Sequence, residues 1–190
     1  MKVVGFNGSA RKEGNTAIAI RTVFEVLESE GIETKLINLA EKKLHGCRAC
    51  YKCAENKNRQ CAFNDDDANE LIEAMLDADG IILGSPVYFS SMSSETKALI
   101  DRAGLVAKTN GNMFARKAGA SVVAVRRAGA CTTFMQMNQF FFINEMIVPG
   151  SSYWNVGFGR EVGAILEDEE GIQTFRTLGK NMAWLLKKIK

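Results

Sequence analysis

Four of the five cysteines in this chain lie in one short, charged segment, residues 46–61, which reads GCRACYKCAENKNRQC. These four are Cys47, Cys50, Cys53 and Cys61, and their spacing is C-x2-C-x2-C-x7-C. Thiols at this density can form disulfides, bind zinc or hold an iron-sulfur cluster. The same motif can also be inherited without any metal. Choosing among these alternatives depends on what the rest of the chain does.

The composition argues against structural disulfides. The chain has 190 residues, of which 46% are apolar and 24% charged, so we expect a single domain, residues 1–190, that folds without cross-links. The N-terminal residues MKVVGFNGSARKEGN lack a signal-peptide core, and no segment reaches the roughly 18 apolar residues of a membrane helix. We therefore expect a cytoplasmic protein, in which thiols stay reduced.

The spacing favours an iron-sulfur cluster over zinc. Three thiolates at two-residue intervals can converge on one face of a cubane cluster, which a fourth thiolate then closes. Zinc prefers two separated cysteine pairs or histidine ligands, and we expect the only histidine, His45, at the surface. A cysteine motif that binds no metal remains an alternative, because the polar residues KNRQ make a long excursion before Cys61. We expect the isolated Cys131 to be a small buried hydrophobe, and the acidic residues 64–67 to begin a helix.

The charge distribution argues against two classes of partner. The net charge is only +2, and acidic and basic residues are interspersed, with no basic stripe beyond the short KKIK sequence at residues 187–190. Nucleic acid and membrane surfaces, which attract proteins through clustered positive charge, are therefore poor candidates.

Short β-rich runs alternate with segments of helical period along the whole chain. Predicted strands cover residues 2–6, 34–39, 80–85, 120–126 and 146–150, and predicted helices cover 15–30, 71–76, 99–106, 132–146 and 172–189. This pattern predicts an α/β fold, namely a doubly wound five-stranded parallel sheet in a three-layer α/β/α arrangement. Ligands of such sheets bind at the carboxyl ends of the strands, so the loops after strands one, three and four should carry the chemistry.

The loop after the first strand, residues 7–16 (NGSARKEGNT), favours a phosphate. It leads into a helix N-terminus, whose free N–H groups and dipole attract anions. Ser9 and Thr16 offer hydroxyls, Asn15 an amide and Arg11 a positive charge. The spacing matches neither the dinucleotide fingerprint nor a Walker A loop, so a mononucleotide fits better. The alternative is a plain turn whose serine and asparagine cap a helix.

The loop after the third strand, within residues 84–102 (GSPVYFSSMSSETKALIDR), could hold a flat heterocycle. Pro86 is rigid, and the backbone groups beside it could bond to the polar edge of a ring. Tyr88 and Phe89 could pack against its face. Such an aromatic pair can equally belong to a core.

Together, GSARKEGNT and GSPVYFSSMSSETKALIDR resemble the NADPH-dependent FMN reductases and the iron-sulfur flavoproteins, relatives of flavodoxin, over nearly the whole chain. The resemblance implies a flavodoxin-like FMN-binding domain. It implies that the FMN phosphate is bound by Ser9, Arg11, Asn15 and Thr16, and that the isoalloxazine is lined by Pro86, Val87, Tyr88 and Phe89. The third flavin loop would include Ala128 and Gly129, where relatives usually have two glycines.

The resemblance also implies the activity. FMN would be reduced by NAD(P)H and would deliver electrons to a flavin, a quinone or a protein acceptor. The flavin supplies this chemistry, so we expect no catalytic acid or base. The cysteine motif matches that of iron-sulfur flavoproteins, whose [4Fe-4S] cluster would here be held by Cys47, Cys50, Cys53 and Cys61. The alternative function is therefore an electron-transfer protein with FMN and a cluster.

The segment FFFI, residues 140–143, makes one predicted helix apolar nearly all round. Such a helix is either deeply buried or lies at a subunit interface. We therefore expect a homodimer or a homotetramer.

Overall fold

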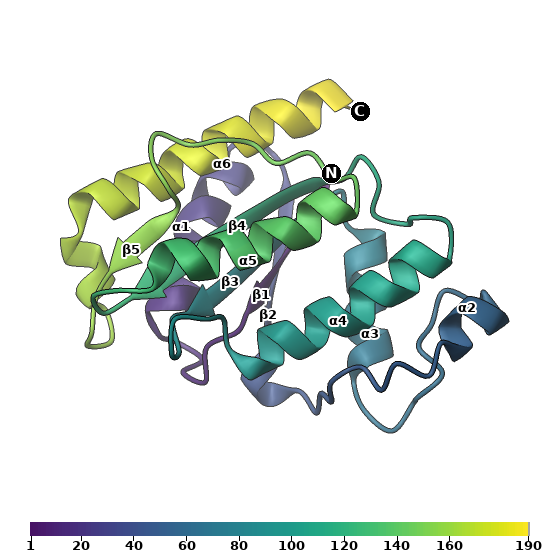
Figure 1. The fold of residues 1–190 in the computed structure, drawn as a ribbon. Coiled ribbons are helices and arrows are strands. Elements are labelled where there is room, and N and C mark those ends of the chain that lie inside the picture. Colours follow the sequence, from purple (N-terminus) through teal and green to yellow (C-terminus); the bar gives the residue numbers. More distant parts are fainter. Residues whose placement is uncertain (190) are drawn as a thin grey trace.

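The computed structural model describes residues 1–189, which form a five-stranded parallel sheet between two layers of helices (Figure 1). The strand order is β2-β1-β3-β4-β5. The elements are β1 (Lys2–Asn7), α1 (Asn15–Ser29), β2 (Glu33–Asn38), η1 (Leu39–Glu41), α2 (Lys52–Asn56), α3 (Ala68–Asp77), β3 (Gly80–Pro86), α4 (Ser94–Thr109), β4 (Ala118–Val125), α5 (Ala130–Ile143), β5 (Val156–Phe158), η2 (Ala164–Glu167) and α6 (Glu169–Ile189). This is the predicted flavodoxin-like, doubly wound arrangement.

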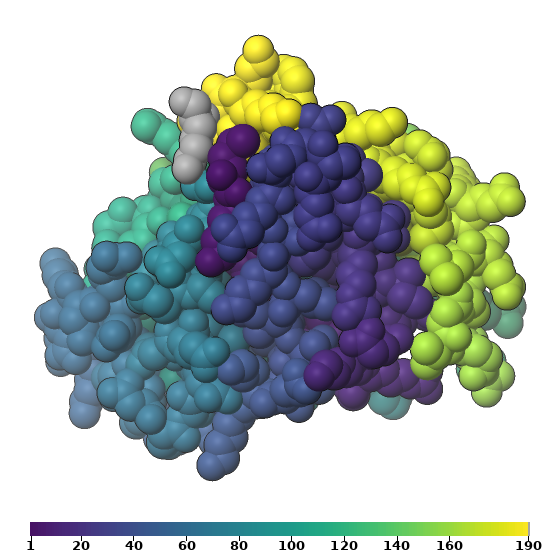
Figure 2. Space-filling view, turned by 180° about the vertical axis from the view of Figure 1, so that it is seen from behind, coloured from purple at the N-terminus to yellow at the C-terminus, as the bar shows by residue number. Residues whose placement is uncertain are grey.

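The core has two halves, one on each face of the sheet. Successive residues of a strand point to opposite faces, so Val3 packs with α1 and α6, whereas Val4 and Phe6 pack with α3, α4 and α5. Figure 2 shows the α1 and α6 face, where the purple to blue N-terminal segments lie beside the yellow C-terminal helix. Among residues 1–189, no helix has both the length and the apolar character that crossing a bilayer requires.

The order of the strands reverses at β1, because β2 pairs with one of its edges and β3 with the other. The loops that follow β1 and β3 therefore leave the sheet side by side at its carboxyl edge. In doubly wound sheets this reversal point is where ligands bind. Since β2 is also parallel to β1, the cysteine segment begins near the same edge.

The predicted fifth strand, residues 146–150, is wrong. Ile147 makes only an isolated parallel bridge with Ala118, and Pro149 has no N–H with which to continue the ladder. The chain then leaves the sheet, and regular pairing resumes at β5, which lies against residues 123–125 of β4. The prediction therefore placed the fifth strand at the isolated bridge of Ile147, whereas the regular strand begins at Val156.

The remaining predicted elements are confirmed within a few residues of their bounds, and the acidic residues 64–67 do precede a helix, α3. The short helix α2, inside the cysteine segment, was not predicted. Helix α5 is buried on only part of its surface. Phe140 and Phe141 are buried, whereas 56% of Phe142 and 65% of Ile143 remain exposed.

Candidate functional sites

The first loop is held by the buried side chain of Asn7, at the end of β1. Its Nδ2 donates to Asn38 Oδ1 (2.8 Å) and to the carbonyl oxygen of Lys12 (3.2 Å). Its Oδ1 accepts the backbone N–H of Ser9 (3.1 Å), and Ser9 Oγ in turn accepts the backbone N–H of Arg11 (3.1 Å). One buried amide therefore fixes the path of the loop at both of its ends.

Helix α1 begins without a side-chain cap. Its N-cap residue is Gly14, and its first turn contains no acidic residue. The N–H groups of that turn therefore receive no hydrogen bond from a capping side chain, and no acidic side chain of the turn offsets the positive end of the helix dipole. This is the arrangement with which proteins bind phosphate at a helix N-terminus.

The side chain of Asn15 connects α1 to the loop after β5. Its Nδ2 donates to the carbonyl oxygens of Gly159 (3.1 Å) and Glu161 (2.8 Å), and its Oδ1 accepts the N–H of Gly163 (2.8 Å). All the main bonding positions of this amide are thus engaged within the protein. Any contact of Asn15 with a phosphate would use its backbone N–H.

The second loop ends in a tight reverse turn. Tyr88 and Ser91 exchange two backbone hydrogen bonds, of 2.9 and 3.0 Å, and the two residues between them have positive φ angles of 48° (Phe89) and 60° (Ser90). Such a turn favours asparagine and glycine, so a phenylalanine here is strained. The turn leaves the ring of Phe89 fully exposed to solvent.

The third loop packs against the second. Gly129 has a φ angle of 85°, and a Cβ atom there would lie 2.9 Å from both Val87 Cγ1 and Ser90 Cα. The N–H of Val87 donates to the carbonyl oxygen of Ala124 at 3.1 Å. Glycine is therefore required at position 129 by its conformation and by this close approach.

One cavity of about 200 Å³ joins the loops at the carboxyl edge. It is lined by the predicted phosphate residues Ser9, Arg11, Asn15 and Thr16, by Pro86, Val87 and Tyr88, and by Ala124, Arg126, Gly159 and Arg160. Of the other predicted flavin residues, Phe89, Ala128 and Gly129 do not line it. Arg126 and Arg160 also line the cavity but were not predicted. Each follows the carboxyl end of a strand by one or two residues, which is the signal that could have identified it.

The cysteine segment is fixed to the rest of the fold by a buried ion pair between Asp66 and Arg102 of α4. Arg102 Nη1 donates to Asp66 Oδ2 (2.8 Å) and Nη2 donates to Oδ1 (3.2 Å). Nη1 and Nη2 also donate to the carbonyl oxygens of His45 (3.0 Å) and Phe63 (3.4 Å). The guanidinium therefore holds both ends of the segment.

The pair is charged. Burial favours the neutral acid, but the hydrogen bonds from Arg102 and from the N–H groups of His45 and Ala68 outweigh it and hold the pKa of Asp66 below its ordinary value. Burial likewise opposes the charge of Arg102, yet Asp66 and the neighbouring Cys61 raise its pKa. Both groups are almost completely inaccessible to solvent.

The C-terminal end of α4 holds the middle of the segment. Asn110 Nδ2 donates to the carbonyl oxygen of Cys53 (3.2 Å), and its Oδ1 accepts the N–H of Arg59 (2.9 Å). Two cysteine sulfurs also have polar neighbours. The hydroxyl oxygen of Thr109 lies 3.8 Å from Cys53 Sγ while its proton is donated to the carbonyl oxygen of Leu105 (2.8 Å), and the N–H of Ala49 donates to Cys47 Sγ (3.4 Å).

All four predicted cysteine ligands line one small cavity of about 20 Å³, which is roughly the room that a single water needs. Cys53 is buried, Cys61 is half-buried, and Cys47 and Cys50 are exposed. Within residues 1–189, no three cysteine, histidine or acidic side chains are placed so that they could hold a metal ion. The thiols thus surround a common space without converging. Cys131, expected to be buried, is exposed, because it lies on the outer side of the first turn of α5.

Comparisons with known proteins identify the family of the chain. The family model of the NADPH-dependent FMN reductases matches residues 1–161. The chain belongs to this family. An iron-sulfur flavoprotein of Methanocaldococcus jannaschii is 41% identical over 197 aligned residues, which cover 100% of both chains. Another, from Methanosarcina thermophila, is 33% identical over 100% of this chain and 97% of its own.

The solved structures show the same fold at lower sequence identity. A flavodoxin, described as a WrbA-like protein from Agrobacterium tumefaciens, superposes with a TM-score of 0.67 at 15% identity, over 100% of this chain and 98% of its own. At this identity the likeness establishes the fold alone.

The residues around the cysteine cavity suit a bound group that presents acceptor atoms. Arg102 lines the cavity, and its Nε is buried without a hydrogen-bond partner among the described residues. Sulfur atoms of a cluster accept N–H groups, and positive charge compensates for thiolates. In this FMN reductase family member the surroundings of the four cysteines therefore fit a cluster, provided that the exposed Cys47 and Cys50 turn inward.

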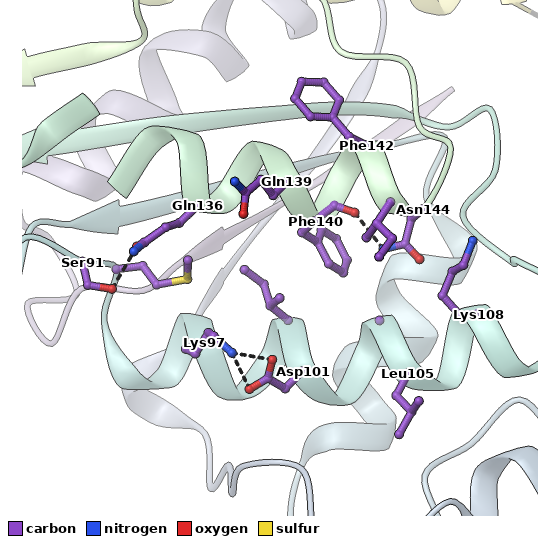
Figure 3. Close-up of a pocket in the computed structure, with 14 residues that line it drawn as sticks. Ser91, Lys97, Asp101, Leu105, Lys108, Gln136, Gln139, Phe140, Phe142 and Asn144 are labelled. Carbon is purple, nitrogen blue, oxygen red and sulfur yellow. Dashed lines mark hydrogen bonds and ion pairs between the residues drawn. The ribbon is translucent and has the colours of Figure 1, made fainter. Parts of the chain in front are cut away.

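A larger groove, of about 750 Å³, runs between α4 and α5 (Figure 3). Phe140 lies between the two helices, and the ion pair of Lys97 and Asp101 lies along α4. One end of the groove reaches the second loop, where Ser91 Oγ donates to Gln136 Oε1 at 2.9 Å. This groove shares no lining residue with the flavin-loop cavity.

Proposed function

We propose that the protein is an FMN-dependent oxidoreductase in which a [4Fe-4S] cluster, held by Cys47, Cys50, Cys53 and Cys61, exchanges electrons with the flavin. The observation that carries this proposal is that all four cysteines line one cavity beside a buried, unpartnered N–H of Arg102. The names of the iron-sulfur flavoproteins that align over the whole chain support it.

FMN would bind across the reversal point of the sheet. Its phosphate would meet the uncapped N-terminus of α1, with the hydroxyls of Ser9 and Thr16 and the charge of Arg11 around it. The cavity of 200 Å³ is smaller than the ~300 Å³ or more typical of ligand pockets, so it suits the phosphate end of the molecule. The loop from Pro86 to Phe89 extends apolar surface beyond it for the ring.

Bound FMN supplies the redox chemistry, since it accepts and releases electrons singly or in pairs. The protein orients it. Asn7 and Asn15 fix the loops on either side of the cavity, and the side-chain amide of each already donates two hydrogen bonds within the protein. The strained turn leaves the ring of Phe89 exposed, so this apolar surface is accessible to an electron acceptor.

The cysteine segment already supplies one backbone donor to a cysteine sulfur. The N–H of Ala49 donates to Cys47 Sγ, and N–H groups of this kind also suit the sulfur ligands of a cluster. The segment around Cys47 and Cys50 has no regular secondary structure, so these two thiols can turn toward Cys53 and Cys61 without breaking a helix or strand.

A second candidate is an NAD(P)H-dependent reductase in which FMN passes electrons to a diffusing flavin or quinone. The description of the matching family, NADPH-dependent FMN reductase, favours it. Steady-state oxidation of NADPH and NADH in the presence of a quinone or free flavin distinguishes the two. Turnover by Cys50→Ser at the native rate would assign the activity to the flavin alone.

The test of the cluster is the iron and sulfide content after anaerobic expression and reconstitution. We expect about four irons per native chain and a loss of most of them in Cys50→Ser, because thiolates hold such clusters. Cys131→Ser, which changes a cysteine outside the segment, is the matched control and should retain its iron. FMN content should be equal in all three proteins. Negligible iron in the native protein would leave a flavin-only oxidoreductase.

A further inference from the structure

Arg102 has one unused hydrogen-bond donor, and it lies at the cysteine cavity. Its two terminal nitrogens make four hydrogen bonds, to both carboxylate oxygens of Asp66 and to the carbonyl oxygens of His45 and Phe63. Its Nε, by contrast, is buried without any acceptor among residues 1–189. A buried donor with no partner is costly, and in a native protein it calls for an explanation.

The surroundings of Arg102 supply one. Arg102 helps to line the cavity that the four cysteines share, and so does Cys61. Cysteine sulfurs are acceptors in that wall, and Cys61 is close enough to Arg102 to raise the pKa of its guanidinium. We propose that the Nε–H of Arg102 donates a hydrogen bond to a sulfur of the bound cluster and thereby raises its reduction potential. This inference rests on the proposed [4Fe-4S] cluster.

The fixed orientation of the guanidinium makes this contact durable. The fork formed with Asp66 is almost completely buried, with the arginine side chain only 3% and the aspartate side chain 0% exposed. A planar guanidinium held by four hydrogen bonds cannot turn its Nε–H elsewhere. Lysine would bring a similar charge but has neither the plane nor a separate Nε–H, so the two are not interchangeable here.

The effect on the potential follows from charge. Reduction adds one electron to the cluster and makes its sulfurs better acceptors, so a donor beside them stabilises the reduced form. Asp66 neutralises much of the positive charge of Arg102 at longer range. The hydrogen bond therefore contributes more to the reduction potential of the cluster than the net charge of the Asp66–Arg102 pair does. An ordinary surface cation would act through its charge alone. Arg102 would thus contact the cluster directly and tune its potential without itself exchanging electrons.

The experiment is a reductive titration of the reconstituted full-length protein, in which the cluster is followed by electron paramagnetic resonance and FMN by its visible spectrum. Arg102→Gln should lower the equilibrium constant for reduction of the cluster about tenfold, which is about 59 mV for one electron. The FMN potentials should not move, because Arg102 does not line the flavin-loop cavity. Arg102→Lys should show most of the same loss.

Two further variants separate this role from a structural one. Arg102→Gln leaves the buried carboxylate of Asp66 without its partner, so the double variant D66N/R102Q removes both charges and protects the fold. Arg48→Gln is the charge control, because its exposed guanidinium pairs with Asp65 at the rim of the segment. It should shift the potential far less, since exposed charges are screened.

The outcomes are distinct. A lower cluster potential in both R102Q and D66N/R102Q, with unchanged FMN potentials, supports the inference. An iron-loaded D66N/R102Q whose cluster keeps the native potential overturns it and leaves Arg102 a purely structural residue. If the native protein takes up no iron, the proposed cluster itself fails, and the inference fails with it.

Discussion

A Cβ atom on Gly8 would lie 1.9 Å from Oγ1 of Thr96, so the first loop lies directly against the first turn of α4. The N–H of Gly8 also donates to the carbonyl oxygen of Gly84 at the end of β3 (2.8 Å). Ser93 caps α4 at this contact by accepting the N–H of Thr96 (3.3 Å). The same helix carries Arg102 and leads to Asn110, which anchor the cysteine segment, so one rigid element joins the two candidate sites.

We predict that Gly8→Ala destabilises the protein by about 1 to 3 kcal/mol, the usual cost of overpacking, and weakens FMN binding. The added methyl group must push the first loop away from α4. The double variant G8A/T96A, which removes the clashing hydroxyl, should recover part of both losses. Gly150→Ala is the matched control, because a Cβ atom there meets nothing within 4 Å. Urea unfolding and FMN titration measure the two effects; equal values for G8A and G150A would contradict the close contact.

Arg11→Ala should weaken FMN binding by roughly 1.5 to 3 kcal/mol, the range for a hydrogen bond to a charged group. Arg11 lines the cavity in front of the uncapped N-terminus of α1. Arg21→Ala removes the same side chain from a later turn of α1, where it pairs with Glu13, and should leave the affinity unchanged. Fluorescence titration of the apoproteins with FMN gives both dissociation constants. Native affinity in R11A would remove Arg11 from the phosphate site.

The fold and the position of the loops could be predicted because their causes are local in sequence. Buried parallel strands lack polar alternation, and parallel strands place their carboxyl ends at one edge. Polar and aromatic residues after strands one and three therefore had to meet. The edge strand was misplaced for a reason of the same kind. Residues 146–150 are apolar and strand-like, and only tertiary pairing shows that the regular ladder begins at Val156.

The ion pair of Asp66 and Arg102 could not be predicted. Asp66 belongs to an acidic run that is typical of the start of a helix. Arg102 lies 36 residues later in the sequence, in a different helix that also carries other charged residues. Arg102 shares the buried stripe of Leu99 and Val106, but the helical period does not identify the distant acid that pairs with it. Arg126 and Arg160 are a similar case, because their roles depend on where β4 and β5 end. The roles of these charged residues depend on contacts with residues far away in the sequence. The sequence pattern predicts only which apolar side chains are buried.

Asp66→Asn should lower the stability at neutral pH by about 3 to 5 kcal/mol, the usual effect of removing one partner of a buried pair. Since the pKa of Asp66 is lowered on folding, its contribution is complete well above the unfolded value of about 3.9 and is lost as the pH falls below it. The native and D66N proteins should therefore differ most at pH 7 and converge in acid.

The control for this prediction is Asp65→Asn, next to Asp66 in the sequence. Asp65 forms an exposed pair with Arg48 at 3.3 Å, which should contribute about 0 to 1 kcal/mol. Urea unfolding at pH 7 and near pH 3 measures all three proteins. A constant difference between native and D66N across this range would mean that Asp66 keeps its charge, or lacks it, in both folded and unfolded chains.

The last prediction concerns association. The exposed Phe142 and Ile143 lie at the C-terminal end of α5 and contribute to the groove shown in Figure 3. We propose that a second copy of the chain covers this apolar surface, giving a homodimer or a dimer of dimers. Burying such a side chain contributes roughly 1.5 to 3 kcal/mol, and a two-fold symmetric interface counts each residue twice. The double variant F142S/I143S should therefore dissociate at concentrations where the native protein is associated.

Light scattering at several concentrations, in the presence of FMN, measures this change in mass. Leu166→Ser is the matched control, because Leu166 is an apolar side chain with 60% exposure that lies outside the groove. The control should keep the native mass, which shows that losing any exposed apolar residue is not enough to separate the copies. Circular dichroism of F142S/I143S checks that the monomer stays folded. A native protein that is monomeric at every concentration, or a double variant with the native mass, would place the interface elsewhere or remove it.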